Sequence, residues 1–197
     1  MRTFLNKPWT NHIGEHNCVP ESTYLADTIE DLVEIVKTTE KKNSTVKPIG
    51  SGHSWSAVGY SAGRMVLPNN LTGRKDLEID VLLPNVKTEN LIRVKSGTTI
   101  REINKILDSV GKAFPRLGGF DGQTIVGACQ TSTHGSVIGS GPLYEMILSY
   151  DLVGAEGKKY RIEKTNGITD VAKFQAKHPG FVLIQDDKYY HSISVGI

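Results

Sequence analysis

The chain has 197 residues and a mass of 21.6 kDa, with 38% hydrophobic and 22% charged residues, which predicts one globular domain or two small lobes. It contains no apolar run of the roughly 18 residues that a membrane span needs, so a membrane-spanning protein is excluded. The formal net charge of +2 provides no basic stripe of the kind that binds nucleic acid.

The two cysteines, Cys18 and Cys129, lie far apart in the sequence and indicate neither a disulfide framework nor a metal-ligand pair. Residues 1–9 have no apolar stretch of the kind that makes a signal peptide. Both features predict a cytoplasmic protein. Glycine is enriched, at 20 of 197 residues against an average of about 7%, so many backbone positions are expected to need it.

Thr28 is expected to cap the first helix, with Asp31 completing a capping box. The apolar residues that follow have the helical period: Ile29, Leu32, Val33 and Val36. A short strand is predicted next, over residues 46–49, and it leads into the turn Gly50-Ser51-Gly52. This part of the chain therefore predicts a small αβ unit.

Two more strands are expected, at residues 81–83 and 91–95. The second alternates apolar and polar side chains, as a strand with one solvated face does. Thr99 is then expected to begin a second helix, with Glu102 in the capping-box position and Gly111 as its C-terminal stop.

Residues 114–141 show no sustained period and are predicted to form ordered loops and short strands, and loops of this length are usually functional. Residues 147–153 and 159–162 flank Ala155-Glu156-Gly157, a pattern typical of an antiparallel hairpin. Thr169 or Asp170 is expected to cap a short helix that runs to residue 177.

The last two predicted strands cover residues 181–184 and 192–197. Ile193, Val195 and Ile197 alternate like a half-buried strand, and the sequence stops there. Because a natural domain rarely ends on an apolar strand with an exposed edge, the chain is predicted to be a fragment of a longer protein.

Two glycine-rich segments, residues 48–56 and 118–136, carry the chemical signal of the sequence. Glycines leave room for backbone N–H groups to approach an anion, and the interleaved Ser and Thr hydroxyls add donors, so both segments suit a phosphate-bearing ligand. The alternative is that both are tight turns. Gly52 is followed by Trp55 where a dinucleotide fingerprint needs glycine, and no helix pattern follows, which disfavours a Rossmann site.

The most specific sequence features are Trp9-Thr10-Asn11, Pro20, residues 50–56, Gly97 with the helix after it, and residues 131–136. Through them the chain resembles the flavin-dependent oxidoreductases with an FAD-binding domain of the vanillyl-alcohol-oxidase type, also called PCMH-type, and most closely the sugar-lactone and alditol oxidases. The resemblance implies an α+β fold in two subdomains, about 1–75 and about 76–197, with extended FAD between them. It also implies a downstream substrate domain that this sequence lacks.

In that family the first glycine segment wraps the pyrophosphate, and the second runs beside the pyrophosphate and the isoalloxazine. No catalytic residue is expected in this chain, because the family's base and substrate pocket belong to the downstream domain. No metal site is expected, since the other histidines (His12, His16, His178 and His191) lack ligand spacing. The residues expected to bind FAD are Ile49, Gly50, Ser51, Gly52, His53, Ser54, Trp55, Ser56, Asp121, Thr124, Gly127, Ala128, Thr131, Ser132, Thr133 and His134.

His53 has a particular role in this resemblance. In relatives with Gly-x-x-His-Ser at this place, the imidazole is joined covalently to the 8α-methyl carbon of the flavin. A neutral imidazole is nucleophilic and Gly52 allows close approach, so covalent FAD through His53 is expected. The alternative is a hydrogen bond from His53 to a loop carbonyl. Ser54 and Ser56 are expected to donate to phosphate or ribose oxygens.

Three residues of the second segment need separate comment. His134 is expected to hold its loop, and Ser132 stands where the family commonly has glycine, which makes the backbone path there a departure from the pattern. Berberine-bridge-type relatives place a second flavin link on a cysteine two residues before a threonine, as Cys129 stands to Thr131. A buried, inert thiol is the alternative for Cys129.

The sequence thus favours the FAD-binding part of an oxidoreductase that oxidises an alcohol carbon of a sugar lactone, alditol or similar small molecule by hydride transfer to flavin N5. A separate or degenerate flavin-binding subunit without catalysis of its own is the second hypothesis. A nucleotide-binding αβ domain without flavin is the third, and it requires both glycine segments to be structural turns. The substrate, and the choice between oxidase and dehydrogenase, stay open.

Overall fold

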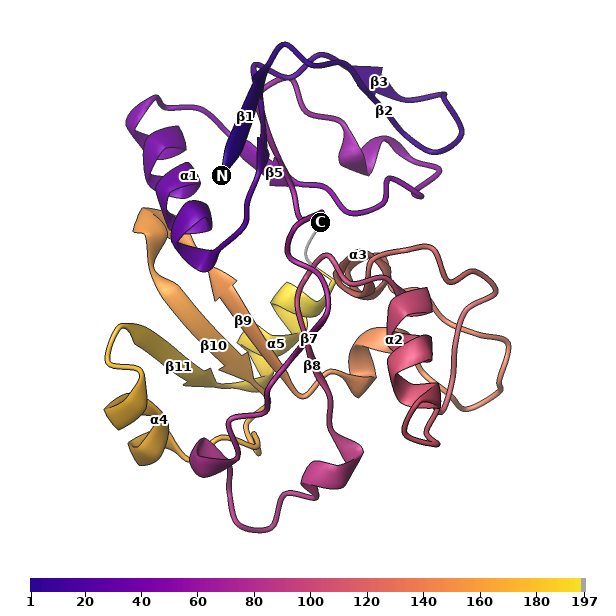
Figure 1. Ribbon diagram of the computed structural model, residues 1–197, viewed down its shortest axis with the longest axis vertical. Coiled ribbons are helices and arrows are strands. Elements are labelled where there is room, and N and C mark those ends of the chain that lie inside the picture. Colours follow the sequence, from indigo (N-terminus) through magenta and orange to yellow (C-terminus); the bar gives the residue numbers. More distant parts are fainter. Residues whose placement is uncertain (196–197) are drawn as a thin grey trace.

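Four strands of the N-terminal third form a mixed sheet in the order β1 (Arg2–Leu5), β4 (Ser22–Leu25), β6 (Arg64–Leu67) and β5 (Val46–Pro48) in the computed structural model, which describes residues 1–195. β1 runs antiparallel to β4, whereas β4 and β5 are both parallel to β6. Figure 1 shows this sheet and its helix at one end of the molecule. Of the four strands in this sheet, only β5 was predicted from the sequence.

Helix α1 (Ile29–Lys41) packs on this sheet through Ile35, which is 2% exposed and belongs to a core cluster with Tyr24 and Val66. Its predicted capping box is confirmed, since Thr28 Oγ1 accepts the Asp31 N–H at 3.1 Å and the Asp31 carboxylate accepts the Thr28 N–H at 3.3 Å. The predicted αβ unit of α1 and β5 is therefore confirmed.

A hairpin of β2 (Trp9–Thr10) and β3 (Asn17–Cys18) extends from this sheet, and its Trp9 and Cys18 pack near Ile49. After β6 the chain passes through β7 (Arg74–Lys75), which pairs antiparallel with β8 (Arg93–Val94). β8 is the short core of the strand predicted over 91–95.

The strand predicted at 81–83 is wrong. Residues Ile79–Val81 form a 3-10 turn, η2, and Leu82 makes only an isolated bridge to Thr169. Val81 is 1% exposed, so its apolar character reports burial inside a turn. A run of three apolar residues does not distinguish a buried turn from a strand. A second such turn, η3, covers Thr88–Asn90.

Helix α2 (Ile100–Asp108) has the predicted capping box of Thr99 and Glu102, with distances of 3.2 Å to the Glu102 N–H and 2.7 Å to the Thr99 N–H. Gly111 follows the helix with φ +66°, a conformation that favours glycine and ends the helix as predicted. Residues 114–141, predicted as loops and short strands, contain the helix α3 (Ile125–Gln130). The 3-10 turn η4 (Leu143–Met146) follows this region. Residues of α2, α3 and η4 form the second core cluster, which consists of Ile100, Ile103, Ile125, Ala128, Cys129 and Leu143.

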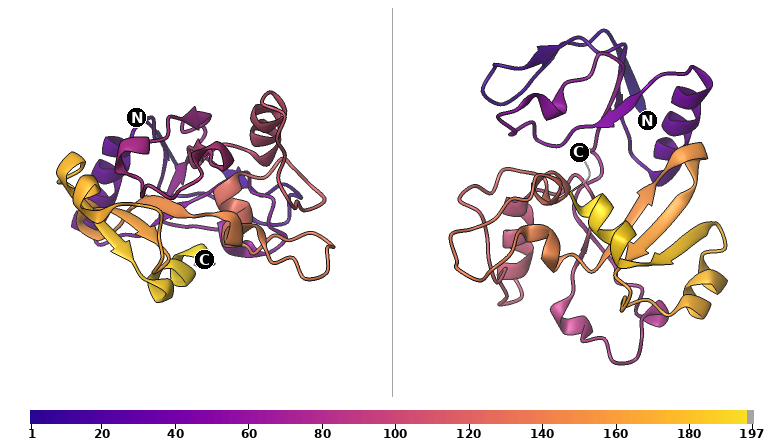
Figure 2. Two further views of the ribbon diagram at one scale, coloured as in Figure 1. Left: turned by 90° about the horizontal axis from the view of Figure 1, so that it is seen from below. Right: turned by 180° about the vertical axis from the view of Figure 1, so that it is seen from behind.

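The predicted hairpin is confirmed by β9 (Ser149–Val153) and β10 (Lys159–Glu163), which pair antiparallel around the turn η5 (Ala155–Gly157). Helix α4 (Val171–Lys177), capped by Asp170, connects β10 to the parallel strand β11 (Phe181–Gln185), as predicted. The resulting sheet, in the order β11, β10, β9, lies on the other side of α1 from the first sheet, with the turn η5 against that helix (Figures 1 and 2).

The strand predicted at 192–197 is wrong over residues 192–194. Helix α5 (Asp187–Ser194) occupies that place, capped by Asp186, whose carboxylate accepts the Tyr189 N–H at 3.0 Å. Tyr190 of this helix is 0% exposed, because its ring packs inward and its hydroxyl donates to the Ile147 carbonyl at 2.6 Å. Residues 196–197 of the predicted strand lie outside the described part.

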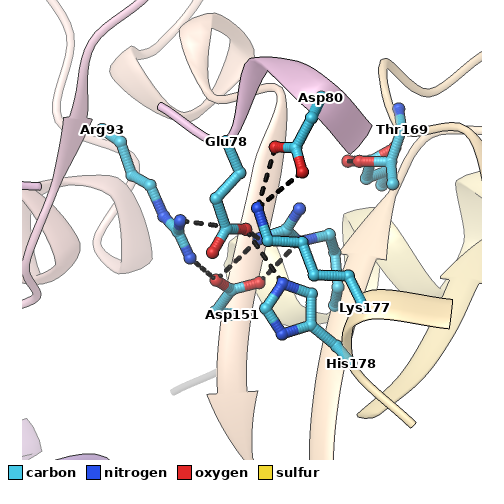
Figure 3. Close-up of polar contacts among 9 residues, drawn as sticks. Glu78, Asp80, Arg93, Asp151, Thr169, Lys177 and His178 are labelled. Carbon is cyan, nitrogen blue, oxygen red and sulfur yellow. Dashed lines mark hydrogen bonds and ion pairs between the residues drawn. The ribbon is translucent and has the colours of Figure 1, made fainter. Parts of the chain in front are cut away.

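An ion-pair network joins the second sheet to the turn η2 (Figure 3). The Asp151 carboxylate of β9 forms ion pairs with the guanidinium groups of Arg161 in β10 and Arg93 in β8, each at 2.7 Å. Glu78 contacts Arg93 at 3.2 Å and His178 at 3.2 Å. The network shows how residues 78–94, with little regular structure, are held against the sheet. Between residues 1 and 195, no helix combines the length and apolar character required to cross a bilayer.

Candidate functional site

A cavity of about 500 Å³ lies where the loop after β5 meets the start of α3. Its size is in the usual range of small-molecule sites. One wall comes from the first glycine segment and the residues on both sides of it, and the other comes from the turn before α3 and from α3 itself. The cavity is lined by Trp9, Asn11, Val46, Lys47, Pro48, Ile49, Gly50, Ser51, Gly52, His53, Ser54, Ser56, Val58, Gly59, Pro68, Ser96, Gln123, Thr124, Val126, Gly127, Gln130 and Thr131.

The two glycine segments contact each other directly at this cavity. Ser51 Oγ accepts the backbone N–H of Thr124 at 3.1 Å. A Cβ atom on Gly50 would lie 2.3 Å from Thr124 Oγ1, so only glycine permits this approach. Thr124 in turn caps α3 by accepting the Gly127 N–H at 3.2 Å. One short polar cluster therefore fixes both walls relative to each other.

The first glycine segment is also held from outside by the β2–β3 hairpin. The His12 N–H donates to the Gly52 carbonyl at 2.9 Å, and the Asn11 side-chain amide donates to the Ser54 carbonyl at 3.1 Å. Gly52 has φ +68°, a left-handed conformation, and the Trp9 ring lies 3.3 Å from the position of a Cβ there. These contacts explain structurally why the Trp9-Thr10-Asn11 sequence accompanies the glycine segment.

His53 lies half-buried at the cavity between two other rings. Its ring centroid is 4.1 Å from that of His12 and 4.5 Å from that of Phe120. Burial lowers the pKa of the His53 imidazole below its ordinary value, and the neighbouring His12 lowers that pKa further. The imidazole is therefore neutral at physiological pH, which is the nucleophilic form.

The structure places part of the predicted residue set at this cavity. The predicted residues that line it are Ile49, Gly50, Ser51, Gly52, His53, Ser54, Ser56, Thr124, Gly127 and Thr131. The other six do not line it. Trp55 is 76% exposed, Ala128 is 1% exposed because it lies on the inner face of α3, and Asp121 pairs with Arg101 at 2.8 Å on the surface of α2.

The remaining three, Ser132, Thr133 and His134, belong to the turn that follows α3. Ser132 has φ +53°, which is the left-handed conformation that glycine adopts at low cost. Ser132 therefore occupies a backbone conformation that favours glycine. His134 Nδ1 lies 2.9 Å from the Gly135 carbonyl and Thr133 accepts the Leu143 N–H at 2.8 Å, so both residues shape the loop.

The structure contradicts the hypothesis of a second flavin link at Cys129. Cys129 is 1% exposed, lies on the inner face of α3 in the core cluster and does not line the cavity. Burial also raises the pKa of the Cys129 thiol to about 12, so the reactive thiolate is scarce. The buried, inert alternative describes this cysteine.

Sequence reasoning missed several cavity residues, of which Lys47 and Gln123 carry the most chemistry. Gln123 stands inside the second glycine segment and could have been found there as a polar side chain between Gly122 and Thr124. Its Oε1 is buried and accepts no hydrogen bond from residues 1–195. Lys47 belongs to a predicted strand, where a lysine normally indicates a solvated face, so no local signal distinguished it.

These residues fit a phosphate-bearing, hydroxyl-rich cofactor. Gly50 and Gly52 keep side-chain volume out of the wall, and the hydroxyls of Ser54 and Ser56 lie at the cavity 3.0 Å from each other. The buried Oε1 of Gln123 needs a donor, and hydroxyl or imide N–H groups of a cofactor are donors. Within residues 1–195, no three His, Cys, Asp or Glu side chains meet in a way that could hold a metal ion.

Comparison with known proteins agrees with this geometry. The chain is 31% identical over 166 residues to D-arabinono-1,4-lactone oxidase of Candida glabrata, a match covering 84% of this chain and 30% of that protein. It is 28% identical over 151 residues to L-gulono-1,4-lactone dehydrogenase of Mycobacterium tuberculosis, covering 76% of this chain and 33% of that protein. The chain thus spans about a third of the length of these relatives.

Among solved structures, a VAO-type flavoprotein from Myceliophthora thermophila superposes with a TM-score of 0.66 at 17% identity, covering 90% of this chain and 29% of that one. This likeness confirms the predicted fold class of mixed helices and sheets of the VAO type. A sequence profile described as "FAD binding domain" matches residues 20–163, most of the chain. The chain therefore belongs to the FAD-binding domain family of flavoproteins.

Proposed function

We propose that this chain binds FAD in the cavity between its two glycine segments and is the flavin domain of an oxidoreductase that oxidises an alcohol carbon of a sugar lactone, alditol or similar molecule. The observation that carries the proposal is the Ser51–Thr124 contact, which brings both segments to one cavity. The names of the relatives, lactone oxidase and lactone dehydrogenase, support this substrate class. Bound FAD would supply the hydride acceptor.

The substrate would be bound by protein beyond these 197 residues, since the chain spans about a third of its relatives. We propose a boundary between two subdomains near residue 75, which separates the sheet of β1, β4, β6 and β5 from the sheet of β9 to β11. We also propose a cytoplasmic location, which the two free, buried cysteines support.

The residues of the chain have distinct parts in this proposal. The backbone N–H groups of residues 50–54 and the hydroxyls of Ser54 and Ser56 would bind phosphate and ribose oxygens. Gln123 Oε1 would accept a hydrogen bond from a cofactor hydroxyl or N–H group. The tilted rings of His12 and Phe120 pack on either side of the His53 imidazole, and its lowered pKa keeps one ring nitrogen unprotonated at neutral pH.

The proposal includes a covalent bond between a nitrogen of His53 and the 8α-methyl carbon of the flavin. Bond formation removes one hydrogen from the imidazole nitrogen and one from the methyl carbon. These two hydrogens amount to two protons and one electron pair, which dioxygen would accept to become hydrogen peroxide, so atoms and electrons balance. The neutral state of His53 and its packing against the His12 ring at the cavity support this assignment.

Acid precipitation tests both parts of the proposal. Purified chain is incubated with FAD, washed and precipitated with trichloroacetic acid, and the flavin absorbance of pellet and supernatant is measured. We expect yellow pellet from the wild type and from His134→Ala, and yellow supernatant from His53→Ala. Supernatant colour from the wild type would contradict the covalent bond alone. Wild-type chain that stays colourless after incubation with FAD would contradict flavin binding itself.

A further inference from the structure

Lys47 is the one charged side chain in the wall of the cavity formed by the described residues, 1–195. It lies in the middle of β5, on the approach to the first glycine segment, and is half-buried. Its Nζ donates to the Val58 carbonyl at 2.9 Å. The ion pairs between side chains in the described part of the chain do not include Lys47, so no carboxylate neutralises its charge there.

A half-buried ammonium without a carboxylate partner is an unusual component of a cavity wall, because partial loss of water is costly unless an anion compensates. The ammonium has three N–H donors, and the Val58 carbonyl takes one of them. The other two are available to a ligand in the cavity. The neighbouring glycine segment adds neutral backbone donors but no charge, so Lys47 alone can balance part of a phosphate charge.

The contact with Val58 also holds the ammonium in place. Val58 belongs to the turn η1 (Ala57–Gly59), which follows the glycine segment, so the Lys47–Val58 bond closes the loop that contains residues 48–57. The ammonium therefore sits at the base of the loop whose N–H groups and hydroxyls face the same cavity. The cation and the neutral donors therefore belong to the wall of one cavity.

We propose that Lys47 is the cationic contact for the diphosphate of the bound dinucleotide. This inference rests on the proposed function and adds a specific binding residue to it. The competing explanation is that Lys47 is only a tether for the loop. The two differ in what they require, because a tether needs a donor to the Val58 carbonyl, whereas a phosphate contact needs a positive charge.

Three substitutions separate these requirements: Lys47→Arg keeps charge and donor, Lys47→Gln keeps a donor without charge, and Lys47→Met has neither. Each is made in the 197-residue chain with His53→Ala, so that binding stays reversible. Lys173→Gln, an exposed lysine on α4, is the matched control. Affinity for FAD is measured by calorimetry at two salt concentrations, and ADP and adenosine are measured as competitors of FAD.

We expect Lys47→Gln and Lys47→Met to weaken FAD and ADP binding about tenfold each, and adenosine binding less than about twofold. Lys47→Arg and the control should bind as the parent does, and the salt dependence should fall only in the uncharged variants. Rescue by Gln, or equal losses for ADP and adenosine, would overturn the phosphate contact while leaving FAD binding intact. A wild-type chain that binds no FAD would refute the proposed function instead.

Discussion

The hydroxyl of Ser51 accepts a hydrogen bond from the backbone N–H of Thr124, across 73 residues of sequence, at 3.1 Å. Thr124 is 6% exposed and also caps α3, so this contact connects the first glycine segment to the N-terminus of the helix on the other side of the cavity. Loss of the acceptor would leave a partly buried N–H group without its partner.

Ser51→Ala is expected to lower the free energy of unfolding by about 1 kcal/mol and to weaken FAD binding, because the two walls of the cavity lose their direct contact. Urea unfolding measures the first effect, and titration with FAD measures the second. Ser136→Ala, at an exposed position at the end of the second glycine segment, is the control. Unchanged FAD affinity in Ser51→Ala would show that the contact does not shape the site.

Gly50→Ala is expected to reduce FAD affinity and to cost about 1–3 kcal/mol of folding free energy, because the added Cβ would lie 2.3 Å from Thr124 Oγ1. Gly119→Ala is the matched control, since a Cβ at Gly119 meets nothing within 4 Å. Thermal unfolding and FAD titration of both variants test the difference. Equal behaviour of the two variants would mean that the segments separate easily to admit a methyl group.

The rate of covalent flavin attachment is expected to depend on pH through His53. Because burial and His12 lower the pKa of His53, the imidazole stays neutral below its ordinary pKa of about 6.5, and the rate falls only at more acidic pH. His12→Phe keeps an aromatic ring at this position and removes the charge of His12, so the midpoint is expected to move upward while the burial effect persists. Attachment is followed by flavin absorbance in acid-precipitated samples.

An unchanged midpoint in His12→Phe would show that His12 acts on His53 through packing alone. A matched control is His191→Phe, a histidine on α5 that does not line the cavity. This variant should keep the wild-type midpoint, and a shift in it would point to a general change in the fold.

Asp151→Asn is expected to destabilise the chain by about 3 kcal/mol at neutral pH, because it leaves the buried Arg161 guanidinium without its main partner. Burial alone would raise the pKa of the Asp151 carboxyl, but the hydrogen bond from Arg161 and the charges of Arg161 and Arg93 hold that pKa below its ordinary value. The stabilisation is therefore full above the unfolded pKa of about 4 and is lost as the pH falls through the folded value.

Urea unfolding at several pH values measures this dependence. The wild type should lose stability as the pH falls below about 4, and Asp151→Asn should lose less over the same range. Glu34→Gln, at an exposed position of α1, is the control and should follow the wild-type curve. Parallel curves for Asp151→Asn and the wild type would assign the acid sensitivity to other carboxylates, such as Glu78.

Cys129 is expected to resist thiol reagents in the folded chain. With its pKa raised to about 12 by burial, only about one thiol in ten thousand is ionised at pH 8. In a Cys18→Ala variant, Ellman's reagent should react with Cys129 only after urea is added. Rapid reaction without urea would show that α3 opens and exposes its inner face.

Local sequence determined the elements whose signals lie within one turn of backbone. The capping boxes at Thr28 and Thr99, and the glycine stop at Gly111, were predictable because caps depend on side chains three residues away. The hairpin of β9 and β10 was predictable because its turn, Ala155-Glu156-Gly157, lies directly between its two strands in the sequence. The strands β1, β4 and β6 were not, since pairing with distant segments decides them.

The two wrong strands show the same limit. Val81 is buried from a turn, and residues 192–194 belong to helix α5, so a short run or alternation of apolar side chains does not determine the backbone shape. The helix α3 was missed because Gly127 and the helix length of six residues weaken the helical pattern. The Ser51 contact that holds its cap, Thr124, comes from a distant segment and leaves no local signal.

The sequence by itself determined that two glycine-rich, hydroxyl-rich segments suit a phosphate-bearing cofactor, because glycine and hydroxyl chemistry is local to each segment. Only the tertiary structure decided which residues meet at the cavity. It brings Lys47 and Gln123 into the wall, turns Trp55 outward and pairs Asp121 with Arg101. These outcomes depend on contacts between residues far apart in the chain, and no local pattern encodes such distances.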